Sequence, residues 1–220
     1  RVLFRSCGFP VRVLHRANGG VSAARNAGLA AAEGRFVAFF DVDDAAAPDY
    51  IRVLTAAAER GDFDVLVFAQ ERVTAQDFAP APSGGETVYV RRGAEEQLRI
   101  FLSDPTRLGV YDLLVRRSFL ERTGLRFPEG YRYYEDYDFL YRAFALAGEV
   151  LCTDRTLYYY ILRTGSAMGR FDGERLRCLE LMEALERWFP DKAPGFAGTF
   201  RAWGAARIYW SALWHAAFKS

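Results

Sequence analysis

The feature that most constrains the fold is an apolar run that ends in three carboxylates. Residues 36–40 read FVAFF and are followed at once by Asp41, Val42, Asp43 and Asp44. An uninterrupted apolar run of this length is typical of a central strand that is buried on both faces. In open α/β sheets, ligands bind beyond the carboxyl ends of the strands. The run therefore predicts an α/β domain with acidic side chains at a ligand-binding edge.

The flanking segments alternate between strand and helix patterns. We expect strands over 11–15 and 64–70, and helices from about Ser22 to Gly34 and from Pro48 to about Arg60. Ser22 is the expected N-cap of the first helix and Gly34 its expected stop. This alternation predicts a mostly parallel, Rossmann-type sheet that is flanked by helices.

The second half of the chain is expected to mix short strands with longer helices. The strand patterns cover 88–90, 149–152 and 156–162, and the helix patterns cover 93–103, 116–123 and 134–147. Two further helices are expected after residue 172, separated by a loop over 190–195 that contains Pro and Gly. They form a C-terminal helical extension.

The composition excludes several classes of protein. Of the 220 residues, 51% are hydrophobic and 26% charged, with a net charge of +1. A disordered chain and a nucleic-acid partner are therefore not expected. No stretch of 18 residues is free of charge, so no transmembrane helix is predicted. Cys7, Cys152 and Cys178 match no zinc spacing, and we expect buried free thiols and a cytoplasmic location.

Asp41 and Asp43 form the first candidate site. Two carboxylates at i and i+2 can share one hard cation, and Mg²⁺ or Mn²⁺ keeps positions open for phosphate oxygens. A solvated turn remains an alternative, in which Asp44 or Asp49 caps the next helix. Asp44 could instead support the site from behind. A haloacid-dehalogenase-like phosphatase would use Asp41 as nucleophile, but it expects Thr or Val where this chain has Ala45.

A longer stretch around this site resembles the family 2 glycosyltransferases. It reads NGGVSAARNAGLAAAEGRFVAFFDVDDAAAP over residues 18–48. The resemblance implies a GT-A fold, with Asp41 near the donor ribose and diphosphate and Asp43 binding the metal. It also implies that the loop and helix carrying Asn18, Ser22, Arg25 and Asn26 line or buttress the nucleotide pocket. The implied donor is a nucleotide-diphosphate sugar, with a UDP-sugar as the first choice.

Glu135 and Asp136 form the second candidate site. Acidic residues favour helix N-termini, so this pair alone could simply begin a helix. The preceding GLRFPEG and the following Arg163-Thr-Gly-Ser resemble the acceptor half of bacterial family 2 enzymes. The resemblance implies that Asp136 is the general base of an inverting transfer, with Glu135 orienting the acceptor or tuning Asp136. Arg163 is then expected to close over the diphosphate, although a surface arginine remains the alternative.

The resemblance also suggests how the chain is divided. Residues 1–168 would form the catalytic domain, with a donor and metal half over 1–92 and an acceptor half over 93–168, and 169–220 the extension. Family members begin with a strand–helix–strand unit that needs about 30 residues. The ten residues before Val11 cannot supply it, so we expect this chain to lack that unit.

The expected acceptor is a glycan or a lipid-linked glycan in polysaccharide synthesis. The C-terminal helix carries Trp203, Trp210 and Trp214, with Arg201 and Arg207. It suits either a peripheral contact with the inner face of a membrane or packing onto the catalytic domain. A non-catalytic module that keeps the fold, or a nucleotidyltransferase with a similar sheet, are the competing hypotheses.

Overall fold

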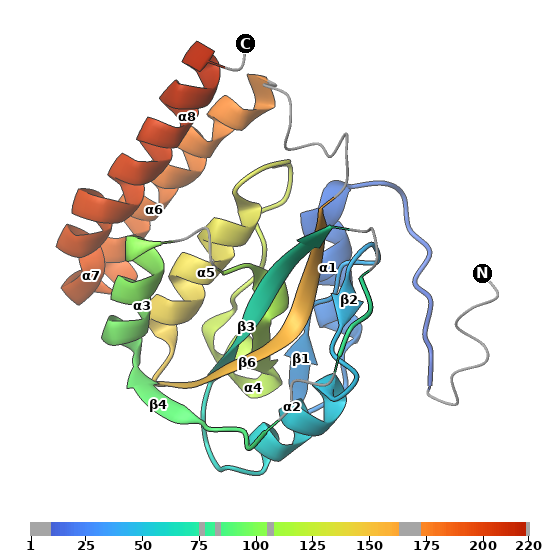
Figure 1. Cartoon of the computed structure of the whole chain (residues 1–220). Coiled ribbons are helices and arrows are strands. Elements are labelled where there is room, and N and C mark those ends of the chain that lie inside the picture. Colours follow the sequence, from blue (N-terminus) through green and yellow to red (C-terminus); the bar gives the residue numbers. More distant parts are fainter. Residues whose placement is uncertain (1–9, 75–77, 82–84, 105–107, 163–172, 219–220) are drawn as a thin grey trace.

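The computed structural model describes residues 10–74, 78–81, 85–104, 108–162 and 173–218 (Figure 1). Six strands form one sheet: β1 (Phe36–Ala38), β2 (Ala45–Ala46), β3 (Val65–Thr74), β4 (Val90–Gly93), β5 (Leu113–Arg116) and β6 (Glu149–Leu162). The first five α-helices are α1 (Gly20–Ala31), α2 (Tyr50–Ala58), α3 (Ala94–Ser103), α4 (Arg117–Thr123) and α5 (Glu135–Leu146). The C-terminal part consists of the short 3₁₀ helix η5 (Gly173–Arg177), α6 (Cys178–Lys192), α7 (Pro194–Thr199), the π-helical turn η6 (Phe200–Ala205) and α8 (Ala206–Phe218).

The sheet is mixed, which corrects the expectation of a mostly parallel one. The strand order is β1-β5-β3-β6-β2, and β4 pairs with the first part of β6. β3 and β6 pair in parallel, whereas the other four pairings are antiparallel. β1 and β3 do run in the same direction, as the strand–helix–strand pattern predicts. However, β5 comes from much later in the chain and lies between them, so the two strands are not neighbours.

β1 is an edge strand of the described sheet, and this corrects a second expectation. It pairs with β5 through Phe36 and Arg116, Val37 and Val115, and Ala38 and Leu114. No other strand of the described residues pairs with its second edge. Phe36 and Val37 are therefore only half-buried, although Phe39 is buried beside Phe127 and Phe139.

Two apolar layers cover the two faces of the sheet. Alternate strand residues point to opposite sides, so Val65, Val115 and Val150 pack with α3, α4 and α5 on one face. Leu66, Leu114 and Leu151 pack on the other face against α2. The described part of the C-terminal helices shares the first core, since Leu185, Phe189 and Phe200 belong to it.

Several local expectations were wrong at their boundaries. Residues 11–15 form no strand and lie exposed along a segment that leads away from the sheet (Figure 1). The first helix begins at Gly20, two residues before the expected Ser22, with Gly19 at the N-cap position and a φ of 81° at Gly20. The strands expected over 149–152 and 156–162 are one long strand, β6.

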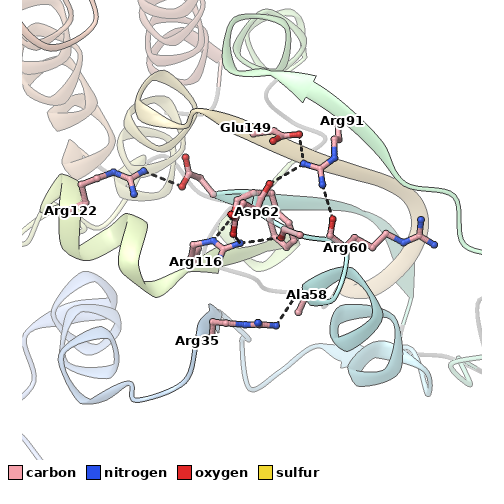
Figure 2. Close-up of polar contacts among 11 residues, drawn as sticks. Arg35, Ala58, Arg60, Asp62, Arg91, Arg116, Arg122 and Glu149 are labelled. Carbon is pink, nitrogen blue, oxygen red and sulfur yellow. Dashed lines mark hydrogen bonds and ion pairs between the residues drawn. The ribbon is translucent and has the colours of Figure 1, made fainter.

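Arginine side chains hold the loop between α2 and β3 (Figure 2). Arg91 donates to the carbonyl oxygens of Arg60 at 2.7 Å and Asp62 at 2.9 Å. Arg116 donates to those of Phe63 at 2.7 Å and Gly61 at 3.2 Å. Four consecutive carbonyl groups thus have charged donors, which fixes the loop at the end of the sheet where β3 begins.

The C-terminal helices pack beside α3 and α5 (Figure 1). Phe200 of η6 lies 5.1 Å from Tyr141 and 4.5 Å from Phe189, measured between ring centroids. Within the described ranges, no helix has the length and apolar character that a membrane crossing requires. Cys152 and Cys178 are buried free thiols, as expected, while Cys7 lies outside the described residues.

Candidate active site

The acidic triplet lies in a turn that directly follows β1. The backbone N–H of Asp44 donates to the carbonyl oxygen of Asp41 at 3.2 Å, which closes the turn. The Asp41 side chain is 35% exposed, and Asp43 is exposed. Both carboxylates therefore lie within reach of a ligand at this edge of the sheet, as the sequence predicts.

Arg25 connects the two candidate sites. Its guanidinium group donates to Asp41 Oδ1 at 3.3 Å and to Glu135 Oε1 at 3.2 Å. The arginine side chain is only 13% exposed and lies over the ring of Phe127 at 5.3 Å. A carboxylate that follows β1 and a carboxylate that begins α5 therefore share one partly buried cation. The structure brings together residues that are 94 positions apart in the sequence.

Glu135 and Asp136 begin α5, where the helix dipole favours negative charge. Glu135 is 7% exposed, and burial together with the negative charge of Asp136 raises its pKa to about 7. Burial also raises the pKa of Asp136, while the positive charge of Arg25 opposes that increase. A carboxyl group with a raised pKa is suited to accept a proton near neutral pH.

The two carboxyl groups differ in what they contact. Glu135 is held by Arg25, whereas Asp136 Oδ1 accepts a hydrogen bond from the backbone N–H of Tyr137 at 2.9 Å. Tyr134, directly before the pair, has a φ of 66°, which turns the chain sharply into the helix. The turn and the ion pair fix the position of Glu135, so the structure gives the two neighbours different surroundings.

Asp44 supports the acidic turn from behind and does not cap α2. Its Oδ1 accepts a hydrogen bond from the backbone N–H of Ile161 at 2.9 Å, and its Oδ2 accepts one from the Tyr158 hydroxyl. Burial raises the pKa of Asp44, and these two hydrogen bonds oppose the increase. The turn is thereby attached to β6, and Asp49 is the residue that precedes α2.

The residues predicted around the donor pocket have different surroundings. Asn18 is exposed, and its Oδ1 accepts from the Gly20 backbone N–H at 3.1 Å, which helps to begin α1. Ser22 is 1% exposed, and its hydroxyl has no hydrogen-bond partner among the described residues. Asn26 braces α1 against the loop before α5, since it bonds the backbone N–H and carbonyl of Phe127, each at 2.9 Å. Arg163 lies outside the described residues.

A groove runs beside the acidic turn. It has a volume of 640 Å³, and residues of α1 and β1 line it together with Arg25 and Asp41. No cluster of three or more His, Cys, Asp or Glu side chains is arranged for a metal ion in the described part of the chain. Mg²⁺ and Mn²⁺ need only one or two protein carboxylates when phosphate oxygens complete the coordination. Asp43, which is exposed, and Asp41, which is half-buried beside Arg25, carry oxygen donors of the kind that suits such an ion.

Two residues near the acidic turn were not predicted from the sequence. Tyr158 is fully buried, stacks on Tyr111 with ring centroids 4.4 Å apart, and supplies the hydroxyl that holds Asp44. Asp112 is also fully buried, and burial raises its pKa to about 8. No spacing in the sequence links either residue to the acidic turn, because Tyr158 lies in β6 and Asp112 in the short 3₁₀ helix η3 (Val110–Asp112), both far from the turn along the chain.

The sequence comparisons decide the family. The model for glycosyl transferase family 2 matches residues 4–123, more than half of the chain. This chain belongs to glycosyl transferase family 2. That membership argues against the phosphatase hypothesis.

Curated relatives of this chain come from bacterial glycosyl-transfer systems. The uncharacterised glycosyltransferase EpsJ of Bacillus subtilis is 34% identical over 152 residues, which is 68% of this chain and 44% of that protein. The succinoglycan biosynthesis protein ExoO of Rhizobium meliloti is 31% identical over 154 residues, with the same two coverages. The chain thus spans about half the length of the curated relatives it matches.

Solved structures confirm the GT-A-like fold class. The 1–349 fragment of Staphylococcus aureus TarS, determined in complex with UDP-GlcNAc, superposes with a TM-score of 0.64 at 23% identity. The superposition covers 81% of this chain and 49% of the TarS fragment. At this level of identity, the likeness shows the fold alone.

Proposed function

We propose that this chain transfers a sugar from a nucleotide-diphosphate donor to an acceptor hydroxyl, with inversion at the anomeric carbon. The observation that supports it most directly is the Arg25 bridge. It keeps a donor-side carboxylate, Asp41, next to an acceptor-side pair, Glu135 and Asp136. A transfer enzyme needs both reactants bound side by side. The UDP-GlcNAc complex of TarS supports a UDP-sugar as the first donor to test.

Each residue of the candidate site has a separate role in the proposed reaction. Asp136 takes the proton of the acceptor hydroxyl while that oxygen forms a bond to the anomeric carbon. The bond from that carbon to the diphosphate oxygen breaks, and the nucleoside diphosphate leaves with the electron pair. Asp43 and Asp41 would hold a Mn²⁺ or Mg²⁺ ion, which supplies positive charge for the leaving diphosphate when it is bound. Glu135, fixed by Arg25, orients the acceptor.

The family setting points to glycan assembly. ExoO is named for succinoglycan biosynthesis, so we propose a glycan or lipid-linked glycan as the acceptor. Asn18, Ser22 and Arg163 stay predicted donor contacts. Ser22 would contact the donor only if its buried hydroxyl moved, whereas Arg25 is already beside Asp41.

Calorimetric titration of UDP into the full chain tests the donor half. We expect binding that requires Mn²⁺ and that weakens by about tenfold or more in Asp43→Asn, because an amide is a poorer ligand for a hard cation. Asp191→Asn is the matched control, since Asp191 is exposed on α6 and pairs with Lys192. A folded chain that shows no Mn²⁺-dependent binding of UDP would contradict the UDP-donor proposal and favour the non-catalytic module.

A further inference from the structure

The C-terminal helical rod, made of η6 and α8, exposes large apolar side chains. Trp203 is 63% exposed, Trp210 is 70% exposed and Trp214 is 41% exposed, and the adjacent Leu213 is 64% exposed. Trp203, Arg207, Trp210 and Trp214 follow each other at steps of four, three and four residues, so they lie along one side of the rod. Single exposed apolar residues are common, but three tryptophans in one row mark an interaction surface.

The opposite side of the same rod is fixed to the catalytic body. Ile208 and Ala212 of α8 are buried in the main core. The Ser211 hydroxyl lies 3.2 Å from the hydroxyl of Tyr134, the residue directly before Glu135. The helix therefore has its inward side occupied, and the fold does not need the tryptophans for its own core. Whatever binds this row lies against a helix that contacts the acceptor side of the site.

The charge pattern changes at the start of this region. Asp191 is the last acidic residue, and residues 192–220 contain Lys192, Arg201, Arg207 and Lys219 but no Asp or Glu. Arg201 is exposed two residues before Trp203 in the sequence. Arg207 is 44% exposed, bonds the carbonyl oxygen of Ser103 and lies 3.9 Å from Asp104. The row of tryptophans thus lies in a segment whose own charged groups are all positive.

We propose that the row Trp203–Arg207–Trp210–Trp214 docks the protein on an anionic lipid surface. Tryptophan is enriched at the boundary between headgroups and hydrocarbon, and basic residues add attraction to anionic headgroups. A helix with an apolar side and basic residues, too short to span, is suited to lie in the plane of that boundary. The docking would hold the acceptor side of the site near lipid-linked acceptors. This orientation rests on the proposed function, whereas the docking itself needs no active donor site.

Vesicle co-sedimentation of the full chain tests this surface. We expect binding to vesicles of mixed phosphatidylcholine and phosphatidylglycerol, and weaker binding to phosphatidylcholine alone. The double variant Trp203→Ser/Trp210→Ser should lower the bound fraction at least about tenfold, because it removes the apolar anchors. The matched control is Ile51→Ser, because Ile51 is 68% exposed on α2, far from the rod in the sequence.

Three results would overturn the proposal. The first is a folded chain that fails to sediment with the mixed vesicles, and the second is a double variant that sediments like the parent. The third is a concentration-dependent dimer in ultracentrifugation without lipid, lost in the double variant and unaccompanied by vesicle binding, which would assign the row to a second copy. Circular dichroism and UDP titration of each variant separate these results from a loss of fold or of the donor site.

Discussion

The arginines at the two ends of β1 bind different kinds of partner. Where β1 begins, Arg116 pairs with Phe36 in the sheet and donates to two neutral backbone carbonyls of the α2–β3 loop. Beyond its other end, Arg25 lies between the carboxylates of Asp41 and Glu135. A backbone carbonyl has no alternative state near neutral pH. A carboxylate can take up a proton or a metal ion, so both partners of Arg25 can change. Arg116 keeps its two carbonyl partners in every state, and its carboxylate partner, Asp62 at 3.3 Å, is fully exposed. The same residue type is thus structural at one end and suited to function at the other.

The largest effect, on the transfer rate, is expected from Asp136→Asn at the end of β1 where Arg25 lies. An amide cannot accept the acceptor proton, so the transfer rate should fall by about 10²- to 10⁴-fold. The stability of the fold should not decrease. A buried carboxyl with a raised pKa binds its proton more tightly in the folded state, so its contribution to stability is lost as pH rises through that pKa. The free energy of unfolding of the variant at pH 7 should therefore equal or exceed that of the parent.

Donor-turnover assays and urea unfolding on the same samples check this prediction. Asp138→Asn is not a suitable control, because Asp138 is buried and bonds Arg142 at 2.9 and 3.0 Å. Asp154→Asn is a better one, since Asp154 is exposed in β6. An Asp136→Asn enzyme with parental turnover would remove Asp136 from the role of base.

An intermediate effect, on stability, is expected from Arg116→Met at the end where β1 begins. Methionine keeps apolar contact with the rings of Phe36 and Phe63, over which Arg116 lies. It removes both hydrogen bonds to the loop carbonyls and the exposed ion pair with Asp62, which together should lower the free energy of unfolding by about 2 kcal/mol. The affinity of the folded variant for UDP should not change.

Chemical unfolding monitored by circular dichroism measures the loss in Arg116→Met. Arg99→Met is its control, because Arg99 is 59% exposed and pairs with Glu95 within one helix. Such a pair contributes less than about 0.5 kcal/mol. Equal stability of the two variants would show that the loop does not depend on its charged donors.

The smallest effect is expected from Arg25→Met, and it concerns pH. The positive charge of Arg25 lowers the pKa of both Glu135 and Asp136, against the stronger effect of burial. Without Arg25 their pKa values rise further. A base works only when it has lost its proton, so the ascending limb of the pH–rate profile should move to higher pH.

Arg25→Lys separates charge from shape in this experiment. It keeps the positive charge, so its limb should stay nearer to that of the parent, while its single ammonium group bridges two carboxylates less well than a guanidinium. An unshifted limb in Arg25→Met would mean that the bridge does not tune the carboxyl pair. Arg25 would then resemble Arg116 in being purely structural.

The sequence alone determined the local chemistry of this protein. The run 36–40 with its acidic end, the motif over 18–48 and the acidic start of α5 predicted the fold class and the carboxylate groups of the site. These signals are local: helix termini, strand ends and contiguous motifs are determined by residues within a few positions of each other. The family match over residues 4–123 confirms what that motif implies about the family.

The tertiary structure determined which of the site's side chains contact each other. No spacing predicts that β5 lies between β1 and β3, that β1 is an edge of the described sheet, or that Tyr158 holds Asp44. The ion pairs that join Asp41, Arg25 and Glu135 likewise depend on how α1 and α5 pack. Strand order and helix packing result from contacts between distant segments, because apolar faces are buried against whichever surface complements them. The sequence determines the residue types, but the packing of distant segments determines which residues contact each other.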